Sequence, residues 1–394
     1  MNSRSVKILA VIVIVLFGVL FALNREDRSE PRDGSNLLFP DLKARLNDLT
    51  QVTVTDADET ITLKREGEAE NARWVVPERA GYSADTGKLR QLLVALSDAE
   101  KVEQKTSDPE LYERLGVADP REDGGEGVLV TAREGDASIS LILGDSAQQD
   151  FRYARVPEQA ESWLVNQNPV LPEDSAGWLL SEIVNIESSR ISSVAIRHSD
   201  GEVVGIHKEN PDDTNFEVEN IPEGRELSYP SVANGIAGAL GNLTLEDVRK
   251  PGGDEEPSVT AEFTTFDGLA IRVSVASENV AGDSDDEDTD EQHWITLEVS
   301  ATEAAEKDEE AAGVDAADSG PPAEEPGEAG ETGEKTADET DQQPAAEQAG
   351  PAEEAATINA RVDGWAYRIS TYKAEQLTRR WEDILRSEED EGTS

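Results

Sequence analysis

Two long stretches of the chain repeat the same order of strand-like and helix-like patterns. Val52 and Val194 each lie in a short alternation of apolar and polar residues, which is typical of a half-buried strand, and they stand 142 positions apart. Later matches keep nearly this spacing, including a helix-like segment at 88–96 that is matched at 231–240. Because each half must then bury its own apolar face, several ordered matches constrain the fold more than any single motif. The sequence therefore predicts a tandem duplication.

Each copy is expected to form an α+β unit built on a mainly antiparallel sheet with packed helices. The first copy spans 46–185 and the second spans 186–388, and each reads as strands, a helix, further strands and a closing helix. The closing helices are expected around Trp178–Ile183 and Trp381–Leu385. The indole side chains and Phe216 are expected to anchor the two hydrophobic cores.

The second copy is longer than the first because of one acidic segment, residues 301–356. This segment holds 18 Asp and Glu residues, two Lys residues and no aromatic residue. Such a composition cannot bury enough apolar surface to offset the entropy of ordering, so we expect disorder. The segment falls between two strands of one unit, which predicts an extended hairpin loop. A shorter acidic run at 283–291 is expected in another hairpin.

The N-terminal region carries an unbroken apolar run of 16 residues, Ile8 to Leu23. As a helix this run covers about 24 Å, against about 30 Å for the hydrocarbon core of a bilayer. The flanking Lys7 and Arg25 can extend their charged ends to the interface and close the difference. We expect an uncleaved signal anchor. The alternative is a cleaved signal peptide, although the residues at 21–24 form a poor cleavage site.

The short basic start before this run predicts a cytoplasmic N-terminus and an extracytoplasmic remainder. We therefore expect a single-pass protein of the inner (cytoplasmic) membrane with the bulk of the chain in the periplasm. The expected organisation is a cytoplasmic tail at 1–7, a transmembrane signal anchor at 8–23, a juxtamembrane segment at 24–45, repeat copies at 46–185 and 186–388 with the insertion at 301–356, and a tail at 389–394.

The composition excludes several classes of function. The 394 residues include 35 Lys and Arg, 85 Asp and Glu, three His and no Cys, for a net charge of −50. Without Cys there is no disulfide, thiol nucleophile or Cys-ligated metal. The negative charge argues against a nucleic-acid partner held by phosphate contacts. Because the excess extends beyond the two acidic segments, it favours a surface adapted to high salt over a patch that steers a cationic partner.

No catalytic, cofactor-binding or metal site is predicted, although three motifs resemble such sites. His198 and His207 lie on neighbouring expected strands, but no third His is near, so solvent-facing histidines are the simpler interpretation. The acidic run at 283–290 lacks the Gly and Glu that an EF-hand loop requires. The glycine run Gly235-x-x-Gly238-x-x-Gly241 does not follow a strand as a phosphate-binding loop does, so close packing is favoured. A carboxylate hydrolase is the least favoured alternative, and no enzyme activity is expected.

A further set of motifs follows the apolar run in a fixed order: Leu38–Asn47, Val52–Val54, Trp74–Val76, Tyr82, Lys88-Leu89 and Asp108–Val117. This order resembles the DUF4340 family of bacterial membrane-anchored proteins over most of residues 38–388. The resemblance implies an extracytoplasmic domain without a known activity. It also implies an association with ABC transporter subunits of the gliding-motility type, namely an ATPase, a permease and a GldG-like protein. The motifs are structural, so no functional residues are carried over.

Taken together, these features predict a membrane-anchored periplasmic accessory subunit of an ABC-type transport system. It would act by binding a protein or a substrate and not by catalysis. The expected partners are the permease, the ATPase and the GldG-like subunit, together with the inner membrane, and neither a cofactor nor nucleic acid. The alternative is a stand-alone cell-envelope protein that binds glycan or peptidoglycan.

Overall fold

A computed structural model of the chain describes residues 36–67, 72–148, 150–252, 256–281, 289–301 and 350–386. The expected cytoplasmic tail, transmembrane anchor and C-terminal tail lie outside these residues. Within them, no helix has the length and apolarity needed to cross a membrane. The chain divides into two compact units, Met1–Leu180 and Ser181–Ser394, so the boundary lies five residues before the one expected between the two copies.

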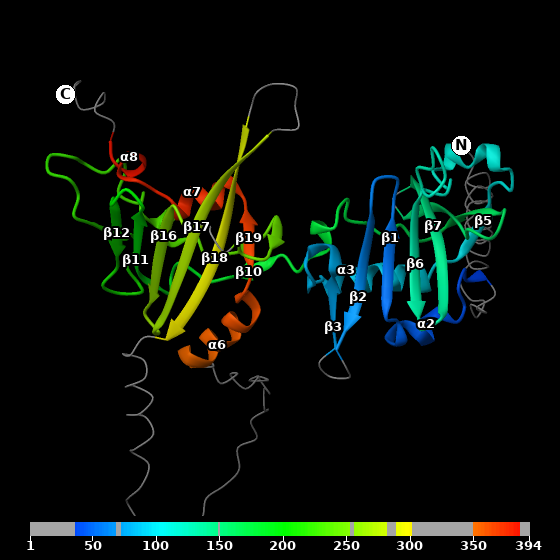
Figure 1. Ribbon diagram of the computed structural model, residues 1–394, viewed down its shortest axis with the longest axis horizontal. Helices are drawn as coiled ribbons and strands as arrows, with labels where there is room; N and C mark the ends of the chain where they lie inside the picture. The colour runs from blue at the N-terminus through cyan, green and yellow to red at the C-terminus, as the bar shows by residue number, and fades with distance from the viewer. Residues whose placement is uncertain are drawn as a thin grey trace, which may run out of the picture. The chain divides into compact units, whose positions relative to one another are not determined.

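Unit 1 contains a sheet of nine described strands in the order β4-β3-β2-β1-β6-β7-β8-β9-β5, and every neighbouring pair is antiparallel (Figure 1). The strands are β1 (Gln51–Thr55), β2 (Thr60–Glu66), β3 (Arg73–Val76), β4 (Tyr82–Ser83), β5 (Lys101–Gln104), β6 (Val128–Glu134), β7 (Ala137–Gln148), β8 (Phe151–Arg155) and β9 (Ser162–Val165). The helices are α2 (Leu42–Arg45) and α3 (Thr86–Ser97), with 3-10 turns η2 (Leu46–Asp48), η4 (Pro77–Arg79), η5 (Pro109–Leu111), η6 (Glu113–Leu115) and η7 (Ala176–Trp178).

The buried face of this sheet follows from the alternation of its residues. Val52 pairs with Leu63 and Val54 pairs with Ile61, and all four side chains are buried. Helix α3 begins where the Asp85 side chain accepts hydrogen bonds from the first backbone N–H groups of the helix. Its leucines recur at the spacing of one helical face, and those buried are Leu89, Leu92, Leu93 and Leu96.

The N-terminal part of unit 1 includes residues that were expected to form a juxtamembrane segment. Leu38 and Leu42 are buried, and the Leu38 N–H donates to the carbonyl of Ala99 at 2.8 Å. Helix α2 packs against α3. The folded unit therefore includes residues from 36 onward, about ten residues before the start expected from the repeat pattern.

Unit 2 contains an antiparallel sheet of eight described strands in the order β13-β12-β11-β16-β17-β18-β19-β15. The strands are β11 (Ile191–His198), β12 (Val203–His207), β13 (Glu217–Glu219), β15 (Asp247–Arg249), β16 (Val259–Thr265), β17 (Leu269–Ala281), β18 (Thr289–Ala301) and β19 (Ala366–Ile369), and a separate pair is formed by β10 (Glu182–Val184) and β14 (Leu243–Thr244). The helices are α4 (Asn234–Ala237), α6 (Pro351–Val362), α7 (Thr371–Leu377) and α8 (Trp381–Ile384).

Apart from β4, which has no counterpart among the described strands of unit 2, the two sheets have the same strand order. Strands β1, β2 and β3 occupy the places that β11, β12 and β13 occupy in unit 2, and β6 to β9 correspond in the same way to β16 to β19. The far edge of the sheet is β5, the strand after α3, in unit 1 and β15, which follows α4 and β14, in unit 2. Val52 and Val194 belong to the two alternating segments that were compared first in the sequence. They lie in the equivalent strands β1 and β11.

Two expected helices are shorter than the pattern indicated. The closing helix around Trp178–Ile183 is a single 3-10 turn followed by strand β10, in which the β-branched Ile183 and Val184 are buried. The helix expected at 231–240 is reduced to the one turn of α4, because three glycines close together, at 235, 238 and 241, disfavour a longer helix.

The acidic insertion lies between β18 and β19, which pair antiparallel as expected, with His293 opposite Ile369. Residues 302–349, on which the expected disorder falls, lie outside the described residues. The end of the segment is helical, because α6 starts with Pro351 in its first turn and buries Ala355, Ile358 and Val362 on one face. Residues 351–356, which were expected to belong to a disordered loop, are therefore helical.

A buried arginine organises the long loop between β5 and β6. Arg155 is only 6% exposed, and its guanidinium donates to the carbonyls of Val117 at 3.0 Å, Pro157 at 3.1 Å and Gln159 at 3.4 Å. The guanidinium also lies 4.3 Å from the centre of the Tyr112 ring. Tyr112 and Val117 belong to the motif Asp108–Val117, so that motif serves to hold this loop against the sheet.

We expect Arg155→Met to lower the free energy of unfolding by about 2–4 kcal/mol, because buried carbonyls lose their donor and the cation–π contact disappears. Urea denaturation of the full chain measures the change. Arg114 is the matched control, since it is exposed and has no hydrogen bond or ion pair with another described residue. Arg114→Met should change stability by less than about 0.5 kcal/mol. Equal effects of the two substitutions would contradict the structural role of Arg155.

Candidate functional site

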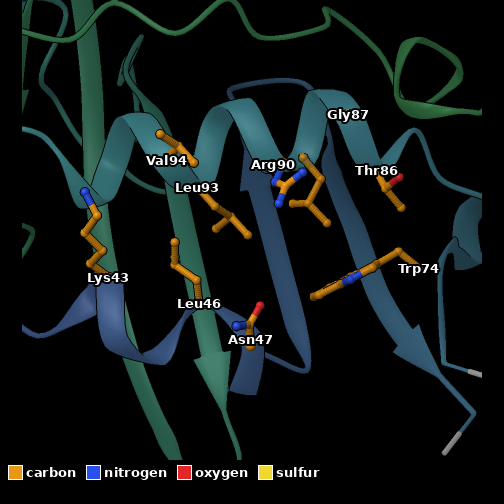
Figure 2. A pocket seen from close by; sticks show the side chains of 10 residues that line it. Lys43, Leu46, Asn47, Trp74, Thr86, Gly87, Arg90, Leu93 and Val94 are labelled. Carbon is orange, nitrogen blue, oxygen red and sulfur yellow. The ribbon is translucent and has the colours of Figure 1, made fainter. Parts of the chain in front are cut away.

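The best-defined hollow of unit 1 is a groove of about 490 Å³ between helix α3 and the α2–η2 segment (Figure 2). Its volume lies within the range of about 300–1,000 Å³ that is usual for small-molecule sites. In Figure 2 the helix α3 runs along one side, and Leu46 and Asn47 of η2 lie on the other. We refer to this hollow as the α2–α3 groove.

One edge of α3 supplies the wall of the groove. Thr86, Arg90 and Val94 are spaced four residues apart, so they share a face of the helix beside the buried leucines. The side chain of Val94 is 43% exposed, which is high for a branched apolar residue. Leu89 and Leu93 form the apolar floor next to this edge.

The ends of the groove carry an aromatic ring and an ammonium group. Trp74 comes from β3, and its partly exposed indole faces the groove below Arg90 (Figure 2). Lys43 comes from α2, and its Nζ lies 2.9 Å from the carboxylate of Asp98. The groove thus brings together residues from three segments that are separated in the sequence.

The charge of the groove is opposite to that of the chain. Its lining contains Lys43 and Arg90 and no Asp or Glu, whereas the whole chain carries a net charge of −50. The side chain of Arg90 has neither a hydrogen bond nor an ion pair with another described residue. A guanidinium in this setting can accept an anion in its two-pronged donor geometry without displacing an existing partner.

The two strand histidines of unit 2 are held apart by the strand register. Ser193 lies opposite His207 in the β11–β12 pair, and His198 lies five residues further along β11, roughly 17 Å away at the rise of a strand. His207 faces Glu219 at 3.2 Å. His198 is buried, with Nε2 3.2 Å from the carbonyl of Arg379, so the expectation that it faces solvent was wrong. Across the described residues, no group of three His, Asp or Glu side chains is arranged to hold a metal.

The glycine run in unit 2 also faces a cation of the chain itself. Lys373 Nζ donates to the carbonyls of Gly238 at 3.2 Å, Ala239 at 3.1 Å and Gly241 at 2.6 Å. A phosphate site needs backbone N–H groups aimed at the ligand, whereas here the carbonyl oxygens point at the ammonium. Burial lowers the pKa of Lys373 from its usual value. The acidic run at 283–290 falls almost entirely outside the described residues.

The tryptophans are less buried than expected. Trp178 and Trp294 are buried, and Phe216 is buried as expected. The other indoles are partly exposed, which corrects the expectation that all of them anchor the cores; these are Trp74, Trp163, Trp365 and Trp381. Of these, Trp74 lines the groove and Trp365 lies under the ammonium of Lys250.

A family model described as Domain of unknown function (DUF4340) matches residues 74–262. The chain is a DUF4340 domain-containing protein. The match begins at Trp74 in unit 1 and ends at Glu262 in unit 2, so it includes Trp74 and Arg90 but not Lys43. Comparison with curated proteins and with solved structures gave no match.

The sequence pattern did not predict the groove of this DUF4340 protein. It places Lys43 in a juxtamembrane segment and Trp74 in a core. A local signal did exist in α3, because Arg90 and Val94 fall on one helical edge that is neither fully apolar nor fully polar. Nothing in the sequence connects that edge with residues 43–47 or with Trp74.

The structure around His198 gives a pH-dependent prediction. The Glu202 N–H and then the Arg380 guanidinium, whose Nη1 lies 2.7 Å from the carboxylate, hold the pKa of Asp200 below its usual value. A carboxyl group with a lowered pKa stabilises the fold above its unfolded pKa of about 3.9 and loses this effect as the pH falls through the lowered value. The stability gap between wild type and Asp200→Asn should therefore shrink from pH 7 to pH 2.

Urea midpoints at a series of pH values measure this gap. The control is Asp212→Asn, because Asp212 is exposed and has no hydrogen bond or ion pair with another described residue. Its stability gap should stay near zero throughout the series. A gap for Asp200→Asn that is constant with pH would contradict a role for the charged carboxylate.

Proposed function

We propose that this chain is a membrane-tethered, non-catalytic binding subunit that works with an ABC-type transport system on the periplasmic side of the inner membrane. The observation that carries the proposal is the α2–α3 groove, a hollow that combines apolar side chains with Lys43 and Arg90 in an otherwise acidic protein. The groove offers positive charge and apolar surface together, which suits recognition better than bond cleavage. The link to an ABC system comes from the DUF4340 resemblance.

The position of the groove in the chain supports a role near a membrane. The apolar run ends at Leu23 and the described structure begins at Asn36, so twelve residues separate them. Twelve extended residues span at most about 40 Å. If the apolar run crosses the bilayer, Asn36, where the described part of unit 1 begins, is held within that distance of the lipid surface.

The shared strand order supports a tandem duplication in which the two copies have diverged. In unit 1 the edge of α3 borders an open groove, whereas in unit 2 the corresponding helix α4 contacts α7. Lys373 of α7 also holds the carbonyls that follow α4. We infer that binding beside this helix belongs to unit 1.

The proposal predicts that the full chain co-purifies with an ABC ATPase and its permease. Native membranes are treated with a mild crosslinker, the tagged chain is recovered, and its partners are identified by mass spectrometry. The control is residues 1–35 fused to the same tag, which carries the apolar run without the folded units. We expect the ATPase and the permease with the full chain and not with the control.

The opposite outcome is equally informative. If crosslinking captures a known periplasmic complex but neither transporter subunit accompanies the full chain, the accessory-subunit proposal is wrong. The stand-alone envelope protein that binds glycan or peptidoglycan would then be the better interpretation. Equal recovery of the transporter with the full chain and the control would also count against the proposal, because the folded units would contribute nothing.

A further inference from the structure

We propose that the α2–α3 groove binds a single amphipathic anion, in which a carboxylate is held by Arg90 and an unbranched apolar chain lies against Trp74, Leu93 and Val94. This inference names the ligand class for the binding role proposed above, and it rests on that proposal. The ligand is a molecule bound one at a time, not a bilayer surface and not a segment of a partner protein.

The positive charge of the lining indicates that the ligand is an anion. Two cations and no carboxylate border the groove. Lys43 already has Asp98 as a partner at 2.9 Å, so its charge is partly neutralised. Arg90 is exposed and has no such partner among the described residues. A planar guanidinium matches a carboxylate with two parallel N–H···O bonds, which makes Arg90 the residue that would hold the head group.

The apolar part of the lining indicates that the ligand also carries a hydrocarbon chain. Val94 is 43% exposed and the Trp74 indole is only partly covered, so both present apolar surface toward the groove. Leu93 lines the groove next to Val94, although it is largely buried. Covering apolar side chains with a hydrocarbon chain removes them from water and is favourable in proportion to the area covered. A small hydrophilic anion would leave this surface exposed, so an amphiphile fits better.

The size of the groove argues against a helix from a partner protein. Two turns of an α-helix, about 10 Å wide and 11 Å long, occupy more than about 800 Å³, so a hollow smaller than this could take in only one face of the helix. The groove offers about 490 Å³. The net charge of −50 disfavours docking on an anionic lipid surface more than binding of one anion, because the surface brings many like charges close to the chain at once. A single amphiphile avoids both difficulties.

The test uses the full chain in native membranes and a photoreactive probe. The probe is a 12-carbon carboxylic acid that carries a diazirine on its chain, and labelled peptides are located by mass spectrometry. We expect labelling in the peptides that contain Trp74 and Leu93. Decanoate should compete with the probe, whereas decanol, which lacks the anionic head group, should not.

Two variants that each lose one positive charge distinguish a direct contact at the groove from an effect of the overall charge. Arg90→Gln should reduce labelling of the groove at least tenfold at a low probe concentration, which corresponds to about 1.4 kcal/mol. Arg114→Gln removes an exposed arginine of the same unit and should leave labelling unchanged. Because Arg90 has no hydrogen bond or ion pair within the described structure, Arg90→Gln should unfold at the same temperature as wild type.

Labelling of the groove that decanol suppresses as well as decanoate does, or that persists in Arg90→Gln, would overturn the proposal. So would a wild-type chain that is not labelled there but binds anionic phosphatidylglycerol vesicles through Arg90, because the groove would then be a membrane-docking surface. The two proposals fail separately. A labelled groove without co-purified transporter removes the ABC role alone, and a co-purified transporter without labelling removes the amphiphile alone.

Discussion

The packing of the α3 leucines against the sheet is the contact on which unit 1 and its groove depend. Leu89, Leu92, Leu93 and Leu96 are all buried, which fixes both the position and the rotation of the helix. The rotation determines where Arg90 and Val94 point, since they lie on the adjoining edge. The N-terminus of the helix is fixed as well, because Asp85 caps it and Lys88 Nζ reaches the carbonyl of Gly177 at 2.7 Å.

The two units share a strand order but differ in the surface around the helix that follows their first strands. In both, a helix follows the first strands and leads to the strand at the far edge of the sheet. In unit 1 that helix is long enough to present a side to an open groove, whereas in unit 2 it is one turn that ends among carbonyls held by Lys373. The fold therefore does not decide the function, and the difference lies in a few residues around the helix.

The strands were predictable because their signal is local. Val52, Val54, Ile61 and Leu63 alternate with polar residues, and the register of β1 and β2 places them on the buried face. The order of the matches along the chain then predicted equivalent places in the two sheets. Local patterns sufficed for neighbours joined by short turns, such as β1 and β2, whereas the pairing of β1 with β6 joins strands that are distant in the sequence.

The shortened helices were harder to predict because tertiary contacts compete with local pattern. The apolar run after Trp178 suited a helix, but pairing with β14 keeps Glu182–Val184 extended. The groove was not predictable for a different reason. Its residues lie at 43–47, at 74 and at 86–94, and only the sheet order and the packing of α2 on α3 bring them together.

The acidic surface and the basic groove are compatible because they act over different distances. In 1 M salt the Debye length is about 3 Å, so repulsion between the −50 chain and an approaching anion is largely screened. A direct contact between a guanidinium and a carboxylate, about 2.8 Å long, is weakened less, and apolar burial is not weakened by salt. If the surface is adapted to high salt, the salt screens the repulsion among the acidic side chains. It also screens the repulsion between the chain and an anion that approaches Arg90. The affinity of the groove should then depend on its apolar contacts more than on the field of the whole protein.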